Sequence, residues 1–195
     1  MRNLKFLVAI LVLVSTSLFS QTTWTVDKAH TKVGFNITHM VITSVEGFFK
    51  DYDAKITSKD DDFSTAGIDF TINTNSIFTD NEKRDNHLRS DDFFNAEKYP
   101  QLIFKSKLIK KVGEDKYKLV GDFTIRDVTK EIELDVKLNG IIKDGFGNTR
   151  AGFKITGEVN RFDYNLKWSK TIETGGLIAG KEVELIINLE ILRKL

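Results

Sequence analysis

The chain contains no cysteine and a single proline, Pro100, among its 195 residues. The absence of cysteine excludes disulfide bonds, thiolate chemistry, zinc–thiolate sites and a lipid-modified N-terminal cysteine. The stability of the folded protein must therefore come from the packing of its core and from the closure of its secondary structure.

The chain also has no large excess of charge of one sign, because it contains 29 lysines and arginines and 28 aspartates and glutamates. A protein without a large field of one sign lacks the electrostatic footprint of a nucleic-acid-binding protein, so we expect no nucleic-acid partner. Tryptophan and methionine are scarce, with 2 of each, whereas there are 15 phenylalanines. That load of phenylalanine predicts a large apolar interior.

The longest apolar run, Phe6–Val14, is too short to span a bilayer, so no stable membrane span is expected. Two basic residues precede this run and a small, polar segment follows it up to Ser20, which is the order of a secretory signal peptide. We predict a signal peptide over residues 1–20 and one mature, soluble domain over residues 21–195, periplasmic or secreted. A buried N-terminal helix is the alternative. Loss of the leader removes two basic residues and no acidic one, which leaves a net charge of −1 from the +1 of the whole chain.

The rest of the chain alternates apolar and polar residues with the period of two that is typical of β-strands. The predicted strands are residues 24–27, 31–39, 45–56, 68–77, 102–108, 117–125, 132–142, 151–159 and 183–191. Eight or nine antiparallel strands joined by short turns close as an up-and-down barrel or pack as a sandwich. We favour an all-β, antiparallel eight-stranded β-barrel, whose interior can be filled by side chains or hold one small ligand.

The alternation also predicts which side chains face inward. The pairs expected to share an inward phase are Phe48 with Tyr52, Phe104 with Leu108, and Leu138 with Ile142. Ile141 and Ile186 are expected on the outer face, where they permit a homodimer. Three further inward positions are Gly121, Gly140 and Gly157, which either leave room for a ligand or mark bends in the strands.

The alternation stops in the segment TDNEKRDNHLRSDDFFNAEKYPQLIFKS, which begins at Thr79. A short helical insert is predicted near residues 79–97. Thr79 and Glu82 have the spacing of a capping box, and Asp85 and Arg89 have that of an ion pair one helical turn apart. We interpret this insert as a lid on the barrel.

Several short motifs stand out in the mature chain. They are Asp27-x-x-His30 before a strand, His39 at the end of that strand, Gly47-x-Phe49, RDNHLRSDDFF followed by KYPQLIFKS, Val120-Gly121-Asp122-Phe123-Thr124 with Val128-Thr129-Lys130, and Arg150-Ala151-Gly152-Phe153. Together they resemble the YceI-like family over essentially the whole mature chain. The motif of the insert is long and unusual enough to be highly specific.

The resemblance implies a lipocalin-like barrel around a long apolar tunnel, in an exported or periplasmic protein. It also implies that the protein sequesters or carries a long-chain polyisoprenoid lipid, such as an isoprenoid quinone or a polyprenyl phosphate. Apart from such a bound lipid, no cofactor and no metal is expected.

Two groups of residues are candidates for contact with such a lipid. Inward residues for the tail are Phe35, Ile37, Ile72, Phe104, Leu119, Phe123, Leu138 and Phe153. Residues for the head group or the lid are His39, Arg84, His87, Leu88, Phe93 and Phe94. Phenylalanine suits a prenyl tail because it offers wide, rigid apolar contact without a polar atom.

Each candidate has a structural alternative. The apolar stripe is alternatively a plain packed core, as in a stress-response binding module without a ligand. His39 is alternatively a core histidine satisfied by a backbone group, and Arg84 a salt-bridge partner of Asp85 or Asp92. His87 follows a lysine by one helical turn, which suggests a solvated side of the helix.

Signals of catalysis are weak in this sequence. There is no G-x-S-x-G elbow, the three histidines lack HExxH spacing, and the glycines of the last long loop lack the residues of a phosphate cradle. We therefore predict a binding protein and not an enzyme. The alternative is an enzyme that modifies an isoprenoid lipid, with Asp85 and His87 as an acid–base pair.

Overall fold

The computed structural model describes residues 21–59 and 61–194, so the predicted signal peptide lies outside the described residues. The strands are β1 (Thr22–Val26), β2 (Lys32–His39), β3 (Thr43–Phe49), β4 (Tyr52–Lys59), β5 (Asp62–Asn73), β6 (Ile77–Phe78), β7 (Gln101–Lys111), β8 (Lys116–Ile125), β9 (Val128–Lys143), β10 (Thr149–Asn160) and β11 (Ala179–Arg193). The helices are α1 (Glu82–Arg89) and the two short 3-10 helices η1 (Thr74–Ser76) and η2 (Arg161–Tyr164).

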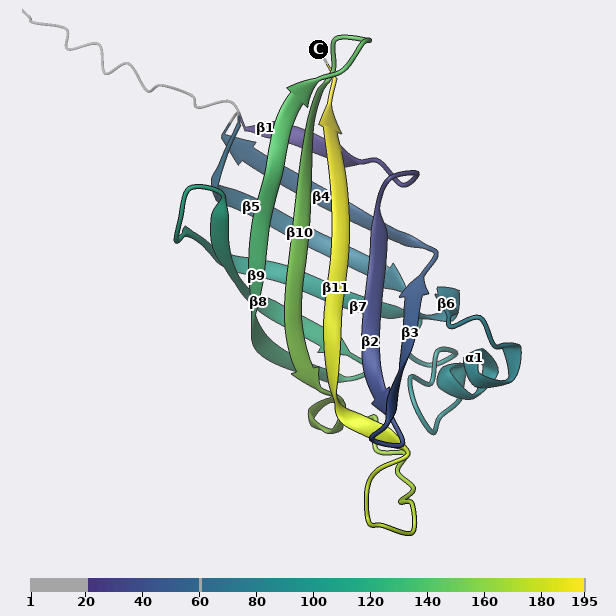
Figure 1. Ribbon diagram of the computed structural model, residues 1–195. Helices are drawn as coiled ribbons and strands as arrows, with labels where there is room; N and C mark the ends of the chain where they lie inside the picture. The colour runs from purple at the N-terminus through teal and green to yellow at the C-terminus, as the bar shows by residue number, and fades with distance from the viewer. Residues whose placement is uncertain (1–20, 60, 195) are drawn as a thin grey trace, which may run out of the picture.

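Eight of these strands form a closed antiparallel ring (Figure 1). Their order is β1, β4, β5, β7, β8, β9, β10 and β11, and the pairing of β1 with β11 closes the ring. At the other end of the barrel, β2 takes the place of β1 beside β11, β3 pairs with β2, and β6 pairs with β3. The predicted all-β, eight-stranded barrel is therefore confirmed.

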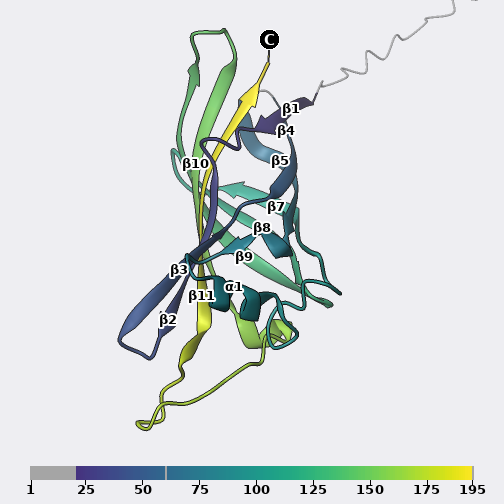
Figure 2. The same ribbon diagram turned by 90° about the vertical axis from the view of Figure 1, so that its right-hand side faces the viewer.

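One side of the barrel wall is interrupted where β6 lies. The ladder between β5 and β7 stops at the pair Asn73–Gln101, and β6 ends the order of the sheet without pairing with β7. Pro100, which has no backbone N–H to donate, directly precedes β7. The predicted insert, with α1, lies beside this end of the wall (Figures 1 and 2).

The strand predicted over residues 45–56 is broken in two between β3 and β4. Phe49 and Tyr52 are both buried although they are three positions apart, so the inward phase changes at the break. The inward expectation for Phe48 is therefore wrong. Its ring instead packs against that of Phe78, with ring centroids 5.3 Å apart.

A β-bulge in β7 reverses the phase in the same way. The register between β7 and β8 shifts between Ser106 and Leu108. A bulge adds one residue to a strand, so the alternation changes sign beyond it. Ile109 is therefore buried and Leu108 exposed, and the inward expectation for Leu108 is wrong.

The pairing of β9 with β10 contains a second shift, next to the pair Gly152–Gly140. Gly140 has a φ of 153°, which side chains rarely adopt. Beyond it Ile141 packs against the core and Ile142 is exposed, so both expectations for these isoleucines are wrong. Gly140 thus marks a bend and does not leave room for a ligand.

Gly121 and Gly157 do not widen the interior either. A Cβ atom added at Gly121 would collide with the ring of Phe104, and one added at Gly157 would collide with Leu134. Neighbouring side chains already fill the space that these glycines release.

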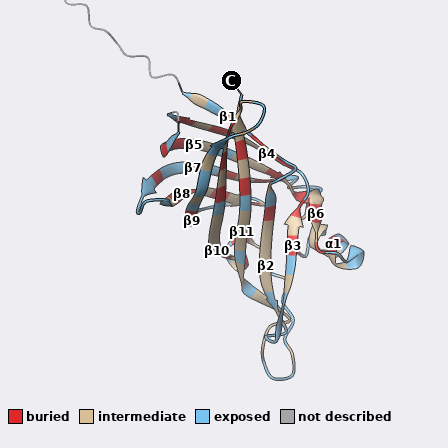
Figure 3. Cartoon of the chain, turned by 45° about the horizontal axis from the view of Figure 1, so that its top comes forward, coloured by how far each residue is buried: buried red, intermediate tan, exposed pale blue. Residues whose placement is uncertain are grey.

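The interior of the barrel has two regions, and buried residues line its wall (Figure 3). We call the end of the barrel where β1 pairs with β11 the closed end. Near it, Phe63 packs against both Trp24 and Phe153, with ring centroids 5.3 and 4.9 Å apart. The indole Nε1 of Trp24 donates a hydrogen bond of 2.8 Å to Ser58 Oγ. This end is a packed core, whereas the end near α1 contains a cavity.

Candidate functional site

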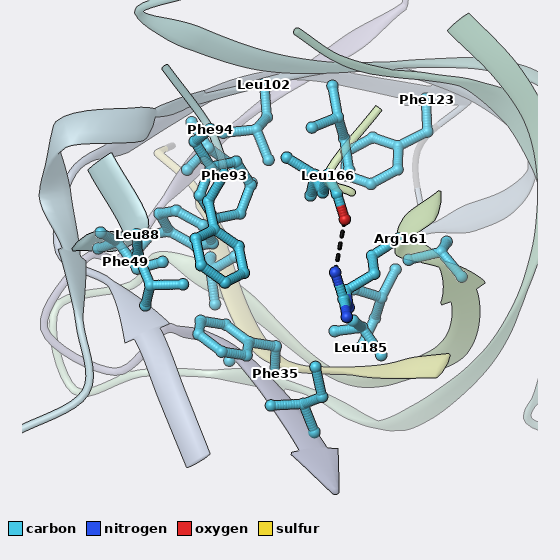
Figure 4. Close-up of a pocket in the computed structure, with 18 of the residues that line it drawn as sticks. Phe35, Phe49, Leu88, Phe93, Phe94, Leu102, Phe123, Arg161, Leu166 and Leu185 are labelled. Atoms are coloured by element: carbon cyan, nitrogen blue, oxygen red, sulfur yellow. Dashed lines mark hydrogen bonds between the residues drawn. The ribbon is translucent and has the colours of Figure 1, made fainter. Parts of the chain in front are cut away.

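A cavity of about 320 Å³ occupies the α1 end of the barrel, within the range of ~300–1,000 Å³ that is usual for small-molecule sites. Its wall is almost entirely apolar and comes from the strands, the insert and the loop after η2 (Figure 4). Side chains that carry oxygen or nitrogen are few in this wall, namely Thr38, His39, Thr79, Arg84, His87, Arg161 and Trp168. They belong to the end of β2, the insert, η2 and the loop after it, so polarity is confined to the end of the cavity away from Trp24.

Six of the eight residues predicted to contact a lipid tail line this cavity. They are Phe35, Ile37, Ile72, Phe104, Leu119 and Phe123. Leu138 and Phe153 do not line it, because Phe153 packs against Phe63 in the closed end and Leu138 pairs with Phe153 across the sheet. A plain packed core therefore describes the closed end and not the α1 end.

All six residues predicted for the head group or the lid line the cavity. They are His39, Arg84, His87, Leu88, Phe93 and Phe94. Figure 4 shows Leu88, Phe93 and Phe94 of the insert gathered near Phe35 and Phe49 of the β2–β3 hairpin. The insert thus forms part of the cavity wall, while the contact of these residues with a ligand stays a prediction.

The start of helix α1 and the side-chain contacts that hold it differ from the predicted capping box and ion pair. Its N-cap is Asn81, whose side chain accepts a hydrogen bond of 3.0 Å from Arg84 N–H, so the capping box beginning at Thr79 is wrong. The predicted pair of Asp85 and Arg89 is also wrong. Arg89 donates to main-chain carbonyls of η1 and β6, whereas Asp85 accepts from Thr79.

Thr79 lies between Arg84 and Asp85. The Nε of Arg84 donates to Thr79 Oγ1 at 2.7 Å and a terminal nitrogen donates to Thr79 O at 2.6 Å. The Thr79 hydroxyl then donates to the buried carboxylate of Asp85. Among the described residues Arg84 makes no direct ion pair with Asp85 or Asp92, and its guanidinium stays on the cavity wall.

The two histidines of the cavity differ in their surroundings. The ring of His39 has no hydrogen-bond partner within residues 21–59 and 61–194, so no backbone group of that region satisfies it. The Nε2 of His87 lies 2.8 Å from Asp92 Oδ2, and its ring packs edge-on against Phe93 and Trp168. His87 therefore links the insert to the loop after η2, and the acid–base pair of Asp85 with His87 is not formed.

Arg161 is a cavity residue that the sequence analysis missed. It is 2% exposed and donates four hydrogen bonds of 2.5–3.0 Å, all to main-chain carbonyls. Figure 4 shows the one to Leu166. Burial lowers the pKa of this guanidinium, and no described carboxylate forms an ion pair with it. Arg161 continues the inward phase of the strand that ends near Val159, and this phase is the signal that could have identified it.

A second polar cluster lies at the opposite end of the barrel. Asp27, His30 and Glu190 bring potential metal ligands within 4.8 Å of one another. The guanidinium of Arg150, however, lies 2.7 Å from Asp27, 2.5 Å from Glu190 and 2.8 Å from Asp144. Hydrogen bonds from His30 and Arg150 lower the pKa of Asp27 to about 2. A cation of the protein itself, the Arg150 guanidinium, thus bridges these carboxylates, so we interpret the cluster as a structural clasp.

A closed antiparallel barrel with an apolar cavity beside a short helical insert defines a lipocalin-like barrel protein. The YceI-like domain matches residues 24–191, and the chain belongs to this family. Within the part of the chain that the structure describes, no helix is long and apolar enough to cross a bilayer.

Relatives of known sequence or structure agree with this assignment. A UPF0312 protein of Staphylococcus aureus strain N315 is 36% identical over 170 residues, which cover 87% of this chain and 96% of that protein. The crystal structure of a YCEI protein of Campylobacter jejuni is 38% identical, with a TM-score of 0.69, and covers 87% of this chain and 96% of that one. A polyisoprenoid binding domain from Saccharophagus degradans shares the fold, with a TM-score of 0.64 at 16% identity over 89% of this chain and 99% of that one.

Proposed function

We propose that the cavity binds a long-chain polyisoprenoid lipid, such as an isoprenoid quinone or a polyprenyl phosphate, which the protein sequesters or carries. The observation that carries this proposal is the distribution of polarity in the cavity wall. The wall is apolar along its length and polar only near His39, Arg84 and Arg161. A lipid with one polar end and a long hydrocarbon tail has the same distribution.

The apolar wall disfavours a ligand with many polar groups, because burying a polar group without a hydrogen-bond partner costs free energy. A ligand with hydrogen-bonding groups along its length would leave them unpaired against the phenylalanines, at a cost of about 1–3 kcal/mol for each group. An isoprenoid tail has no such groups, and each buried CH₂ contributes roughly 0.8 kcal/mol. The family resemblance and the name of the Saccharophagus degradans domain support the same ligand class.

We propose that the protein is exported, on the basis of its first twenty residues. We also propose that it binds its lipid and does not catalyse a reaction on it. The N-terminal sequence of the protein recovered from the periplasm or the medium tests export, with Gln21 as the expected first residue. Catalysis predicts a chemically altered lipid after incubation, whereas binding predicts that the lipid is recovered unchanged.

The experiment that tests the ligand is organic extraction of the purified protein followed by mass spectrometry. We expect a polyprenyl lipid in the extract, and uptake of added quinone or polyprenyl phosphate by the delipidated protein. The absence of a co-purified lipid together with no uptake of either compound would overturn the proposal.

A further inference from the structure

The turn between β2 and β3 combines backbone strain with exposed apolar side chains. Met40 and Val41 have φ values of 51° and 67°, and the N–H of Ile42 donates to His39 O at 3.2 Å. A turn with two left-handed central residues strongly favours Asn-Gly, and a β-branched valine there is an outlier. Val41 is 63% exposed and Ile42 is 85% exposed. Neither turn chemistry nor burial explains these residue types.

This turn is held against the loop that precedes β11. The N–H of Met40 donates to Ile178 O at 2.8 Å, and Val41 packs so closely on Gly176 that a Cβ there would lie 2.7 Å from its Cγ2 atom. The hairpin and the loop project together beyond the barrel (Figures 1 and 2). We call residues 40–42 with Ile172 and Leu177 the apolar tip.

The apolar tip continues directly into the wall of the cavity. His39 precedes Met40 in the chain, and its Cα pairs with that of Ala179 at the start of β11. His39, Ile178 and Ala179 all line the cavity. A surface that covers the tip therefore also adjoins the polar end of the proposed lipid site.

The size of the apolar tip and the charge of the adjoining loop indicate what kind of surface the tip binds. Five residues are far fewer than the roughly 20–30 per side of a stable protein interface, whereas a bilayer accepts the shallow insertion of a few apolar side chains. Lys167 and Lys170 are exposed in the adjoining loop and form no ion pair within the described residues, and Glu173 is the one acid among residues 165–178. Lysines beside an apolar edge suit a bilayer with anionic headgroups.

We propose that the cavity end of the protein docks on an anionic lipid bilayer through the apolar tip. Docking rests on the proposed function for its purpose, because it brings the cavity to the membrane from which a polyisoprenoid is taken or to which it is delivered. The contact itself needs no ligand in the cavity.

Sedimentation of the processed, delipidated protein with vesicles tests this docking. The vesicles contain equal parts of phosphatidylcholine and phosphatidylglycerol. In the triple variant Met40→Asn, Val41→Gly, Ile42→Ser, the turn receives residues that its backbone favours. We expect its thermal midpoint to be equal or higher. Its vesicle binding should fall about tenfold or more, because the Val41 and Ile42 side chains that insert into the bilayer are lost.

Phe146→Ser provides the matched control. Phe146 is 90% exposed on the β9–β10 turn at the opposite end of the barrel, so its loss should leave vesicle binding unchanged. Vesicles of phosphatidylcholine alone should bind the wild-type protein several-fold less tightly. The proposal is overturned if the triple variant binds like the wild-type protein or if Phe146→Ser loses as much binding. Because the protein is delipidated, a failure of docking is separate from a failure of the lipid site.

Discussion

The buried carboxylate of Asp85 accepts two hydrogen bonds from Thr79, one of 2.9 Å from its N–H and one of 2.5 Å from its hydroxyl. The same hydroxyl accepts a hydrogen bond of 2.7 Å from Arg84 Nε. Thr79 therefore connects the start of the insert to α1 and sets the position of Arg84 on the cavity wall. This one hydroxyl group thus contacts both Arg84 and Asp85 of α1.

Thr79→Val should loosen the insert, because it removes the hydroxyl and leaves Asp85 and Arg84 each without one partner. We expect the free energy of unfolding to fall by about 1–3 kcal/mol. Thr79→Ser keeps the hydroxyl and should retain more of that stability. Urea denaturation of the two variants makes the comparison, and equal stability of the two would show that the hydroxyl does not anchor the lid.

Arg161→Lys should destabilise the loop after η2. A lysine keeps the charge, but its single ammonium group cannot replace a planar guanidinium that reaches four carbonyls. We expect a loss of about 2–4 kcal/mol in the free energy of unfolding and faster proteolysis within residues 165–178. The control is Arg193→Lys, a partly exposed arginine on β11. Similar small losses in both variants would contradict the role assigned to Arg161.

The clasp around Arg150 should make stability depend on pH in the acid range. Hydrogen bonds from His30 and Arg150 lower the pKa of Asp27 to about 2, and Arg150 lowers that of Asp144. A carboxylate with a lowered pKa in the folded state stabilises it above the unfolded pKa of about 3.9, and this stability is lost as the pH falls through the folded value. We expect denaturation midpoints to fall steeply below about pH 4.

His30 adds a smaller dependence of the opposite sign. The hydrogen bond to Asp27 raises the pKa of His30, so its contribution is complete below about pH 6.5 and is lost as the pH rises through the raised value. Arg150→Met should flatten the acid limb and lower stability at pH 7, because Asp27, Asp144 and Glu190 lose their shared partner. Lys118→Met, which removes exposed ion pairs on the outer wall, should leave the acid limb unchanged. An unchanged acid limb in Arg150→Met would contradict the clasp.

The alternation of residues predicted the barrel because it persists along most strands, but it could not predict where the phase reverses. Because of the bulge in β7, Ile109 faces inward in place of Leu108. Because of the bend at Gly140, Ile141 faces inward in place of Ile142. These shifts depend on pairing between strands that are distant in the sequence. A short window of sequence contains no information about that pairing.

The set of side chains that line the cavity was also predictable only in part. The predicted residues of the insert line the cavity, and the inward phase and the family motif both indicate them, while their contact with a ligand stays a prediction. Phe153 and Leu138 share the same phase, but Trp24 and Phe63 fill the barrel at their level. Phase shows which side chains point inward, and the packing of four distant segments decides where a cavity remains.

Native mass spectrometry of two tryptophan variants tests the central claim most directly. Leu185 lines the cavity, whereas its neighbour Ile186 on β11 does not. The account predicts that the wild-type protein and Ile186→Trp carry the mass of one polyisoprenoid lipid and that Leu185→Trp, whose indole fills the cavity, does not. An equal lipid mass on Leu185→Trp, or none on the wild-type protein after incubation with polyprenyl phosphate or quinone, would contradict it.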